Sequence, residues 1–599
     1  MKDLAASPSP VAATGGLARL EALAPVLVLL IAGACLPLFN DAYLGVIGTR
    51  ACIYWVLVSG LNLVVGFAGQ IAIGWVALLT LGAYVTSVLT AGTVAPELSP
   101  YLALAIAGVF GAIFGVIVGL PALRLRTFYF AMTTLGFATI VTQVALAWKS
   151  VTGGGVGVPG PIFPWPFSSP WGFYFFCLGL ALLCTWMTVN LAASRFGRAL
   201  VAIRDAEVAA EAVGISKPGL LVKVFLFSGA VAGVAGGLFA SLQSYITPDA
   251  FTFDLSVLFF IAILIGGRGS ILGPLLGTII LTALPEFAAP LVAWSTFLYA
   301  VLLLIIVLAM PGGIAEALDF KNRRPLERHR EIRPRPELLG TLSNSDASPD
   351  VLTLKGVSLS FGGVRAIDDL ALEIRVGEVH GLIGPNGSGK TTTLNVISGY
   401  YAPQQGQVLL SGRPLRPRAP HTRAAQGIAR TFQTPRLIGA ASVLDNVMIG
   451  GSKDGRGTFV ESLMALSRHR RDEAKLAQAA MAALSVVGLE QLAFARSDRL
   501  QHGELRFVEI ARALMLRPSF LLLDEPAAGL SVDEIKRLGD LILTVSRQGT
   551  GVLLVEHHAD LIFDICDRVT VLNLGKVLAS GTPAEIRAHR EVVNAYLGA

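Results

Sequence analysis

Residues 384–391 read Gly384-Pro385-Asn386-Gly387-Ser388-Gly389-Lys390-Thr391, and this stretch decides the fold around it. The apolar residues 379–383 before it predict a strand, and residues 391–397 predict a helix. Glycines let the backbone curl so that its N–H groups face phosphate oxygens at the start of a helix. Lys390 adds a positive charge, and Thr391 adds a hydroxyl for Mg²⁺. The sequence therefore predicts a phosphate-binding loop between a strand and a helix.

A second apolar run, residues 520–523, ends in the carboxylates Asp524 and Glu525. A strand that delivers two acids in succession can place one on Mg²⁺ and leave the next free to polarise water. We expect Asp524 to bind the metal and Glu525 to activate the water. Short apolar strands alternate with amphipathic helices from residue 351 onward, which predicts an α/β domain of about 250 residues.

A third motif lies between these two. Leu500-Gln501-His502-Gly503-Glu504 ends twenty residues before Asp524 and opens a predicted helix over 505–515. With the three motifs in this order, residues 351–599 resemble the ATP-binding cassette (ABC) family of α/β P-loop ATPases. Two cassettes enclose ATP in that family, so the resemblance implies that Gln501, His502, Gly503 and Glu504 face the ATP of a partner cassette. The usual signature is Leu-Ser-Gly-Gly-Gln, and Glu504 brings negative charge near the phosphate, so we expect this to be the weaker site.

The same resemblance implies further roles. Phe361 matches the aromatic residue that stacks on adenine, Gln433 the glutamine that touches Mg²⁺, and His557 the switch histidine near the γ-phosphate. It implies ATP and Mg²⁺ as cofactors, Glu525 and His557 as catalytic residues, and Thr391, Gln433 and Asp524 as the metal site. The predicted ATP-binding residues are Phe361, Gly384, Pro385, Asn386, Gly387, Ser388, Gly389, Lys390, Thr391 and Thr392.

The composition of the whole chain excludes a single soluble enzyme, because 53% of the 599 residues are apolar and only 15% are charged. The net charge of +6 gives no reason to expect a nucleic-acid partner. Before residue 312, apolar runs near the length that crosses a bilayer recur. They predict a polytopic α-helical membrane bundle of about ten spans, in contact with lipid, ahead of the α/β domain. The runs are 20–38, 44–67, 70–91, 100–120, 127–148, 170–192, 221–246, 253–267, 271–285 and 289–311.

Charge placement predicts the orientation. Residues 321–337 hold seven Lys or Arg and three prolines, which is typical of a cytoplasmic linker. The basic loop with Arg195, Arg198 and Arg204 is also expected in the cytoplasm, so an even number of crossings must separate it from the linker. Two short segments that break at Gly266–Ser270 supply that even number, whereas one long segment over 253–285 does not. Both termini then lie in the cytoplasm. A signal peptide is not expected, because the first run is long and membrane spans follow it. The predicted domains are an N-terminal tail (1–19), a transmembrane permease domain (20–315), a linker (316–350) and an ATP-binding domain (351–599).

The amphipathic loop 197–214 resembles the coupling helix by which ABC importer permeases contact their cassette, and this implicates Arg204, Glu211 and Gly214. Gly60-Leu61-Asn62-Leu63 and Thr134-Leu135-Gly136-Phe137 are among the segments that make residues 45–315 resemble the permease subunits of branched-chain amino acid importers. Ala429-Arg430-Thr431-Phe432-Gln433 resembles the matching ATPase subunit.

Polar and small residues in the predicted spans also carry information. Asn62 and Gln70 either form contacts between helices or line a substrate pathway. Gly229, Gly233 and Gly237 recur every four residues, which predicts one helix face that packs closely on a neighbour.

The combined features predict a fused permease and ATPase that imports branched-chain or other hydrophobic amino acids across the bacterial inner membrane. Import of urea or short amides is the alternative, and an export half-transporter fits less well because the predicted spans are too many. The resemblance implies a periplasmic solute-binding protein, and a second permease with a second ATPase or a homodimer.

Overall fold

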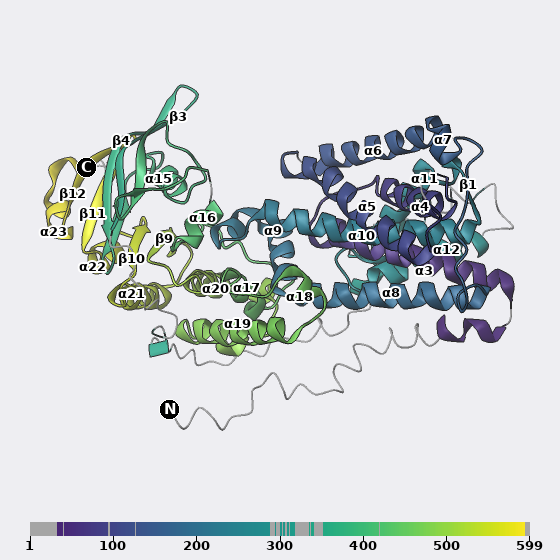
Figure 1. Ribbon diagram of the computed structural model, residues 1–599. Helices are drawn as coiled ribbons and strands as arrows, with labels where there is room; N and C mark the ends of the chain where they lie inside the picture. The colour runs from purple at the N-terminus through teal and green to yellow at the C-terminus, as the bar shows by residue number, and fades with distance from the viewer. Residues whose placement is uncertain are drawn as a thin grey trace. The chain divides into compact units, whose positions relative to one another are not determined.

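The computed structural model describes residues 33–287 except 40, 94, 95 and 126, residues 312–317, residues 351–592 except 419, and isolated residues within 294–310 and 335–340. The chain forms two compact units, which are labelled by element in Figure 1. One comprises Met1–Val189 and Leu221–Asn322, and the other comprises Asn190–Leu220 and Arg323–Ala599. The predicted coupling segment therefore groups with the C-terminal unit.

The first unit is helical. Among the described residues, six helices are long and apolar enough to cross a membrane: Ala42–Phe67, Pro100–Leu123, Thr127–Ala147, Pro170–Ala192, Lys217–Gln243 and Pro248–Gly266. Val76–Thr90 and Gly273–Glu286 are shorter apolar helices. The predicted runs 20–38 and 289–311 lie largely outside the described residues. The expected number of about ten spans is therefore not confirmed.

The helices of this unit keep the order of the predicted runs. They are α3 (Ala42–Asn62), which continues as a π-helical turn (Leu63–Phe67), α4 (Val76–Thr90), α5 (Pro100–Gly119), α6 (Thr127–Ala147), α8 (Pro170–Ala192), α10 (Lys217–Gln243), α11 (Phe253–Gly266) and α12 (Gly273–Phe287). A short antiparallel pair, β1 (Val158–Pro159) and β2 (Tyr245–Ile246), joins two of the connections.

The predicted run 70–91 is helical only from Val76, so this boundary was wrong. The backbone N–H groups of Ile73 and Gly74 donate instead to Thr134 Oγ1, each at 3.2 Å. A Cβ at position 74 would collide with the Thr134 carbonyl, so this approach requires glycine. An irregular backbone inside a membrane needs such partners from neighbouring helices.

The predicted break at Gly266–Ser270 is confirmed. Helix α11 ends at Gly266 and α12 begins at Gly273, with Gly267 at φ +119° between them. The side-chain amide of Asn62 donates to the Ser270 carbonyl at 2.8 Å, and its oxygen accepts from the Gly269 N–H at 3.0 Å. Both polar groups of Asn62 thus hold the break, which favours the contact interpretation over a substrate pathway. Gln70 donates only locally, to the Ala68 carbonyl at 3.3 Å, and its place on a pathway stays a prediction.

The glycine face of α10 packs as the spacing predicts. Side chains added at Gly229 and Gly233 would meet backbone atoms of α5, and one added at Gly237 would meet Thr86 on α4. Backbone-to-backbone approach of this kind replaces the hydrophobic effect as the source of helix association in lipid.

The second unit contains two sheets. The larger has the order β12-β11-β5-β10-β9-β8 and is parallel except for β12. Its strands are β5 (Val379–Ile383), β8 (Ile428–Arg430), β9 (Phe520–Asp524), β10 (Gly551–Val555), β11 (Arg568–Asn573) and β12 (Lys576–Gly581). The smaller, antiparallel sheet has the order β4-β3-β6-β7, built from β3 (Val351–Phe361), β4 (Val364–Arg375), β6 (Gln405–Leu410) and β7 (Arg413–Pro414). Buried residues of both sheets share one apolar core.

Helices surround these sheets, and α17, α19 and α20 lie side by side with α9 against α17 and α16 (Figure 1). They are α9 (Arg195–Ala212), α15 (Lys390–Ile397), α16 (Pro420–Ala425), α17 (Val443–Gly450), α18 (Phe459–Leu463), α19 (Ser467–Val486), α20 (His502–Leu514), α21 (Val532–Arg547), α22 (Ala559–Ile565) and α23 (Pro583–Ala588). The predicted strand 379–383 is confirmed, and the predicted helix 391–397 begins one residue earlier.

We expect Gly233→Leu to destabilise the helical unit, because the new side chain would force α10 away from α5. Overpacking of this kind typically costs about 1–3 kcal/mol. Thermal unfolding of the detergent-solubilised chain measures it. The control is Gly179→Leu on α8, an exposed site where an added Cβ has no neighbour within 4 Å. Equal unfolding temperatures for the two variants would contradict the packing.

Candidate functional site

The predicted phosphate loop joins the buried strand β5 to α15. Its glycines adopt backbone angles that suit few other residues, with φ +154° at Gly384, +81° at Gly387 and +104° at Gly389. Pro385 is half-buried and Asn386 is exposed, while Thr391 and Thr392 lie in the first turn of α15. The hydroxyl of Ser388 is buried and has no partner in the described structure. The loop thus presents a helix N-terminus and an unpartnered hydroxyl, both suited to a phosphate.

Lys390 folds back over this loop. Its Nζ donates to the carbonyls of Gly384 at 2.7 Å and Pro385 at 3.0 Å. Burial lowers the pKa of Lys390, while the nearby carboxylates of Glu525 and Asp524 act in the opposite direction. The ammonium group therefore lies in the field of the acid pair at the end of β9.

The predicted acids lie at the C-terminal end of β9. Asp524 is 3% exposed, and Arg430 donates to its Oδ2 at 3.0 Å. Burial raises the pKa of Asp524, and the Arg430 guanidinium opposes that rise. The following residue, Glu525, has a left-handed backbone at φ +49°, a strained conformation for a non-glycine residue.

Two predicted side chains, those of Gln433 and His557, meet the carboxylate of Glu525. Gln433 Nε2 donates to one carboxylate oxygen at 2.7 Å, and His557 Nε2 lies 2.8 Å from the other. The carboxylate is thus held on both oxygens by two segments that are far from it in sequence. This arrangement can orient a general base toward a bound water.

The donor set suits Mg²⁺. Thr391, Gln433 and Asp524 offer hydroxyl, amide and carboxylate oxygens, and a hard cation that keeps phosphates and waters as further ligands prefers oxygen donors. Among the described residues, there is no cluster of three His, Cys, Asp or Glu side chains that could hold a metal by themselves.

The signature residues begin α20. Gln501 is the N-cap, and its backbone N–H donates to the Glu504 carboxylate at 2.7 Å in a capping box. His502 Nε2 lies 3.3 Å from the Ala528 carbonyl, and Gly503 packs against the Glu534 carboxylate. The negative charge of Glu504 thus serves to cap its own helix.

Phe361 ends β3 and is 47% exposed, and its ring meets that of Tyr401 edge-on at 5.1 Å between ring centroids. An exposed aromatic face is available for stacking on a planar ligand.

Buried charges on α20 hold the segment around Gln433, which the sequence did not reveal. Arg506 donates to the carbonyls of Phe432, at 2.8 Å, and Gln433. Glu509 is 1% exposed and pairs with Arg512 at 3.3 Å. Burial raises the pKa of Glu509 to about 7, opposed by Arg512 and Arg506. These residues look like an ordinary polar helix face in sequence, because burial cannot be read from residue type alone.

The N-terminal half of α9 is held by charge. Arg198 donates to Glu473 on α19 at 2.5 Å, and the Arg195 backbone N–H donates to the same carboxylate at 2.8 Å. The Arg195 guanidinium donates to the Ser452 carbonyl at 3.1 Å and also to the carbonyls of Gly455 and Gly457. The side chains of Arg198 and Glu473 are mostly buried, so loss of either one would leave a largely buried charge without its partner.

The C-terminal half of α9 is held by apolar contact. The helix is kinked at Ala206 (φ −149°, ψ +60°), and three alanines from the kink onward pack on Phe432. The Tyr400 hydroxyl donates to the Val208 carbonyl at 2.6 Å. The alanines are Ala206, Ala209 and Ala212.

The three predicted coupling residues lie along the same helix and its end. Arg204 pairs with Asp205 at 2.7 Å, and burial raises the pKa of Glu211 with help from Glu207. Gly214 has φ +88° and faces Ala424 of α16. The cassette residues that contact α9 elsewhere, Tyr400 at Val208 and Glu473 at Arg195 and Arg198, were missed because each is an isolated polar residue in sequence.

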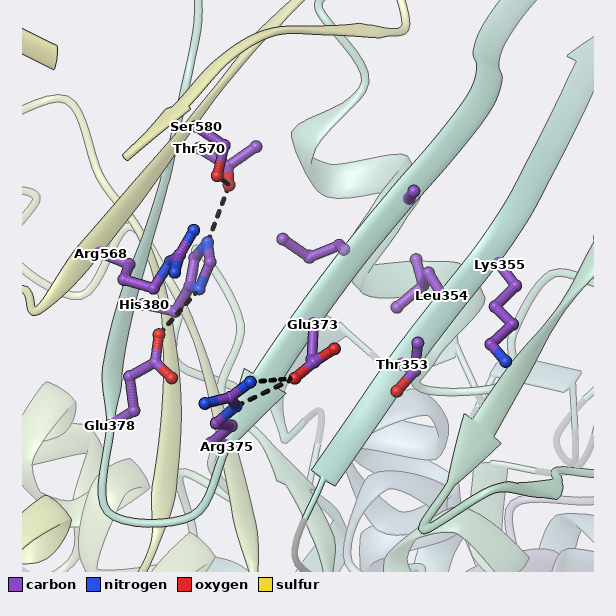
Figure 2. A pocket seen from close by; sticks show the side chains of 12 residues that line it. Thr353, Leu354, Lys355, Glu373, Arg375, Glu378, His380, Arg568, Thr570 and Ser580 are labelled. Atoms are coloured by element: carbon purple, nitrogen blue, oxygen red, sulfur yellow. Dashed lines mark hydrogen bonds and ion pairs between the residues drawn. The ribbon is translucent and has the colours of Figure 1, made fainter. Parts of the chain in front are cut away.

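A separate hollow of about 390 Å³ lies between the N-terminal end of β3 and the start of β5 and β11 (Figure 2). His380, which is 2% exposed, lies 2.8 Å from Thr570 Oγ1 and 3.3 Å from Glu378. None of the predicted ATP-site residues lines this hollow, so it is distinct from the candidate site.

Three family models match the chain. The permease component of the branched-chain amino acid transport system matches residues 44–310, the ABC transporter model matches 367–528, and the branched-chain amino acid ATP-binding cassette transporter model matches 576–599.

Individual relatives match the cassette. The high-affinity branched-chain amino acid transport ATP-binding protein LivG of Salmonella typhimurium is 37% identical over 252 residues, which cover 42% of this chain and 99% of LivG. LivG of Escherichia coli K12 and BraF of Pseudomonas aeruginosa are each 36% identical over the same shares. The chain belongs to the branched-chain amino acid ABC transporter family and carries a membrane-embedded permease and an ATP-hydrolysing cassette in one polypeptide.

Proposed function

We propose that the chain couples ATP hydrolysis to the import of branched-chain or other hydrophobic amino acids. The observation that carries the proposal is the chain of contacts from α9 to Glu525. Helix α9 packs on Phe432, the next residue is Gln433, and Gln433 donates to Glu525. Helix α9, which lies in the chain between the apolar helices α8 and α10, is thereby connected to the candidate catalytic carboxylate.

Each site residue has a proposed role. The phosphate loop and Lys390 bind the phosphates of ATP, and Phe361 stacks on the adenine. Thr391, Gln433 and Asp524 would hold Mg²⁺. Glu525 accepts the proton of the attacking water, and His557 orients the Glu525 carboxylate. The chemistry that Mg²⁺ supplies when bound is neutralisation of charge on the β- and γ-phosphates. Gln501, His502 and Gly503 contact the ATP of a partner cassette.

Coupling follows from these roles. ATP binding closes the cassette on a partner cassette, α9 transmits the closure to the permease helices, and hydrolysis at Glu525 resets the cycle. The proposal includes Mg²⁺, a second permease and second ATPase or a homodimer, and a periplasmic solute-binding protein. It places the chain in the bacterial inner membrane with both termini in the cytoplasm. The predicted domain bounds 1–19, 20–315, 316–350 and 351–599 remain part of the proposal.

An uptake screen tests the solute. Liposomes containing the complete complex and its binding protein are supplied with radiolabelled leucine, isoleucine, valine, urea and acetamide, with ATP inside or outside. We expect ATP-dependent uptake of the branched-chain amino acids. Lys390→Ala sets the background, because losing a charged phosphate ligand weakens ATP binding roughly 10–100-fold. The matched control is Lys536→Ala on the exposed face of α21. Uptake of urea or acetamide alone would contradict the amino-acid assignment.

We expect Glu525→Gln to bind ATP with near-normal affinity and to hydrolyse it about 10²–10⁴-fold more slowly, because an amide cannot accept the proton of the attacking water. Phosphate release and binding of a fluorescent ATP analogue measure the two properties. Glu373→Gln, an exposed change on β4 outside the predicted ATP-binding residues, is the control. Wild-type turnover in Glu525→Gln would assign the base elsewhere.

We expect Arg198→Glu to lower uptake at least about tenfold while ATPase activity persists, because it places a second negative charge against Glu473. Glu473→Arg alone should act similarly, and the charge-swapped double variant should recover part of the uptake. Lys475→Glu, an exposed change on the same helix, is the control. Full coupling in both single variants would show that this end of α9 does not transmit the signal.

A further inference from the structure

Arg430 is a buried arginine to which the proposed ATP chemistry gives no role. It ends β8 beside β9 and is 5% exposed. Its guanidinium donates to Asp524 Oδ2 at 3.0 Å and to Asn395 Oδ1 at 2.7 Å. Asn395 belongs to α15, the helix that begins with Lys390. One guanidinium therefore joins the acid strand to the helix of the phosphate loop.

The same guanidinium lies over two aromatic rings. Its central carbon is 5.1 Å from the ring centroid of Phe432 and 6.0 Å from that of Tyr400, within the range of cation–π attraction. Both rings belong to the cluster that packs on α9, and the Tyr400 hydroxyl donates to the Val208 carbonyl. Arg430 thus contacts the cassette residues that receive the C-terminal half of α9.

The ion pair between Arg430 and Asp524 is buried. The side chains of Arg430 and Asp524 are each 4% exposed. A buried charge without a partner is costly. We therefore expect the Asp524 carboxylate to stay paired with the Arg430 guanidinium when the guanidinium moves. The position of the guanidinium in turn depends on the hydrogen bond to Asn395 and on the rings of Phe432 and Tyr400.

We propose that Arg430 is a positioning residue that ties the orientation of the Asp524 carboxylate to the seating of α9. This rests on the proposed function, in which Asp524 is a ligand of Mg²⁺. When α9 is seated, the rings hold Arg430 against Asp524. When α9 withdraws, Tyr400 loses its bond to Val208 and Phe432 loses its alanine neighbours, and the carboxylate loses its set orientation. The Mg²⁺ concentration needed for nucleotide binding therefore depends on whether α9 is in contact with Phe432 and Tyr400.

Nucleotide binding as a function of Mg²⁺ tests the first link. The full chain in lipid nanodiscs is titrated with a fluorescent ATP analogue, both in EDTA and at increasing Mg²⁺. Arg430→Lys keeps the charge but loses the planar fork. We expect the Mg²⁺ concentration for half-maximal binding to rise about 10–100-fold, the usual effect of removing an outer partner of a metal ligand. Binding in EDTA should stay unchanged.

Arg436→Lys is the matched control. The Arg436 guanidinium also lies over the Phe432 ring, at 5.7 Å, but the hydrogen bond that Asp524 accepts comes from Arg430. We expect its Mg²⁺ requirement to equal that of the wild type. A rise in Arg436→Lys equal to that in Arg430→Lys would assign the effect to the ring alone and overturn the proposal.

Tyr400→Phe tests the link to α9, because it keeps the ring and removes only the bond to Val208. The loss of one hydrogen bond should raise the Mg²⁺ requirement roughly threefold. In the Arg430→Lys background the same change should add nothing, because both act through one path. Additive effects would overturn the relay. If Arg430→Lys does not fold, an unchanged Mg²⁺ requirement in Tyr400→Phe overturns the proposal by itself.

The outcomes separate the two levels of inference. A wild-type chain that binds no nucleotide overturns the proposed function, and the role of Arg430 with it. A wild-type chain that binds nucleotide with a Mg²⁺ requirement shared by both variants overturns the role of Arg430 alone.

Discussion

Strand β9 carries two carboxylates to one edge of the sheet, and the first of them lies almost entirely out of reach of water. A carboxylate in that position must be neutralised by a partner that is itself held in place. Arg430 supplies this partner from the neighbouring strand, and Gln433 and His557 hold the second carboxylate from two other segments. The segments that carry Arg430, Gln433 and His557 therefore converge on Asp524 and Glu525.

The segment around Gln433 has a second set of supports. Arg506 on α20 donates to its backbone carbonyls, and α20 begins with the signature residues. Helix α9 contacts the same segment from another side, through Phe432. One short stretch thus receives contacts from the signature helix, the acid pair and α9. Displacement of any one of these has a direct mechanical route to the other two.

Much of this could be predicted from sequence, because local motifs have local causes. The glycines of residues 384–391 and the apolar runs beside them predict their strand and helix with an error of one residue. The break near Gly267 follows from glycine clustering in the same way. The residues that hold α9 and Asp524 in place could not be predicted. Tyr400, Glu473 and Arg430 act through contacts between segments that are distant in sequence. The start of α4 was misplaced for a similar reason, since Thr134 supplies the hydrogen bonds that a helix would otherwise make.

The docking of α9 on the cassette joins two parts of one polypeptide. The alignment with LivG covers 99% of that protein and 42% of this chain. In the fused chain, docking is intramolecular, so its occupancy does not depend on the protein concentration. The contact between α9 and the cassette then needs only modest intrinsic affinity to stay occupied. Because α9 and the cassette belong to one polypeptide, dilution of the protein cannot separate them even where the contact opens.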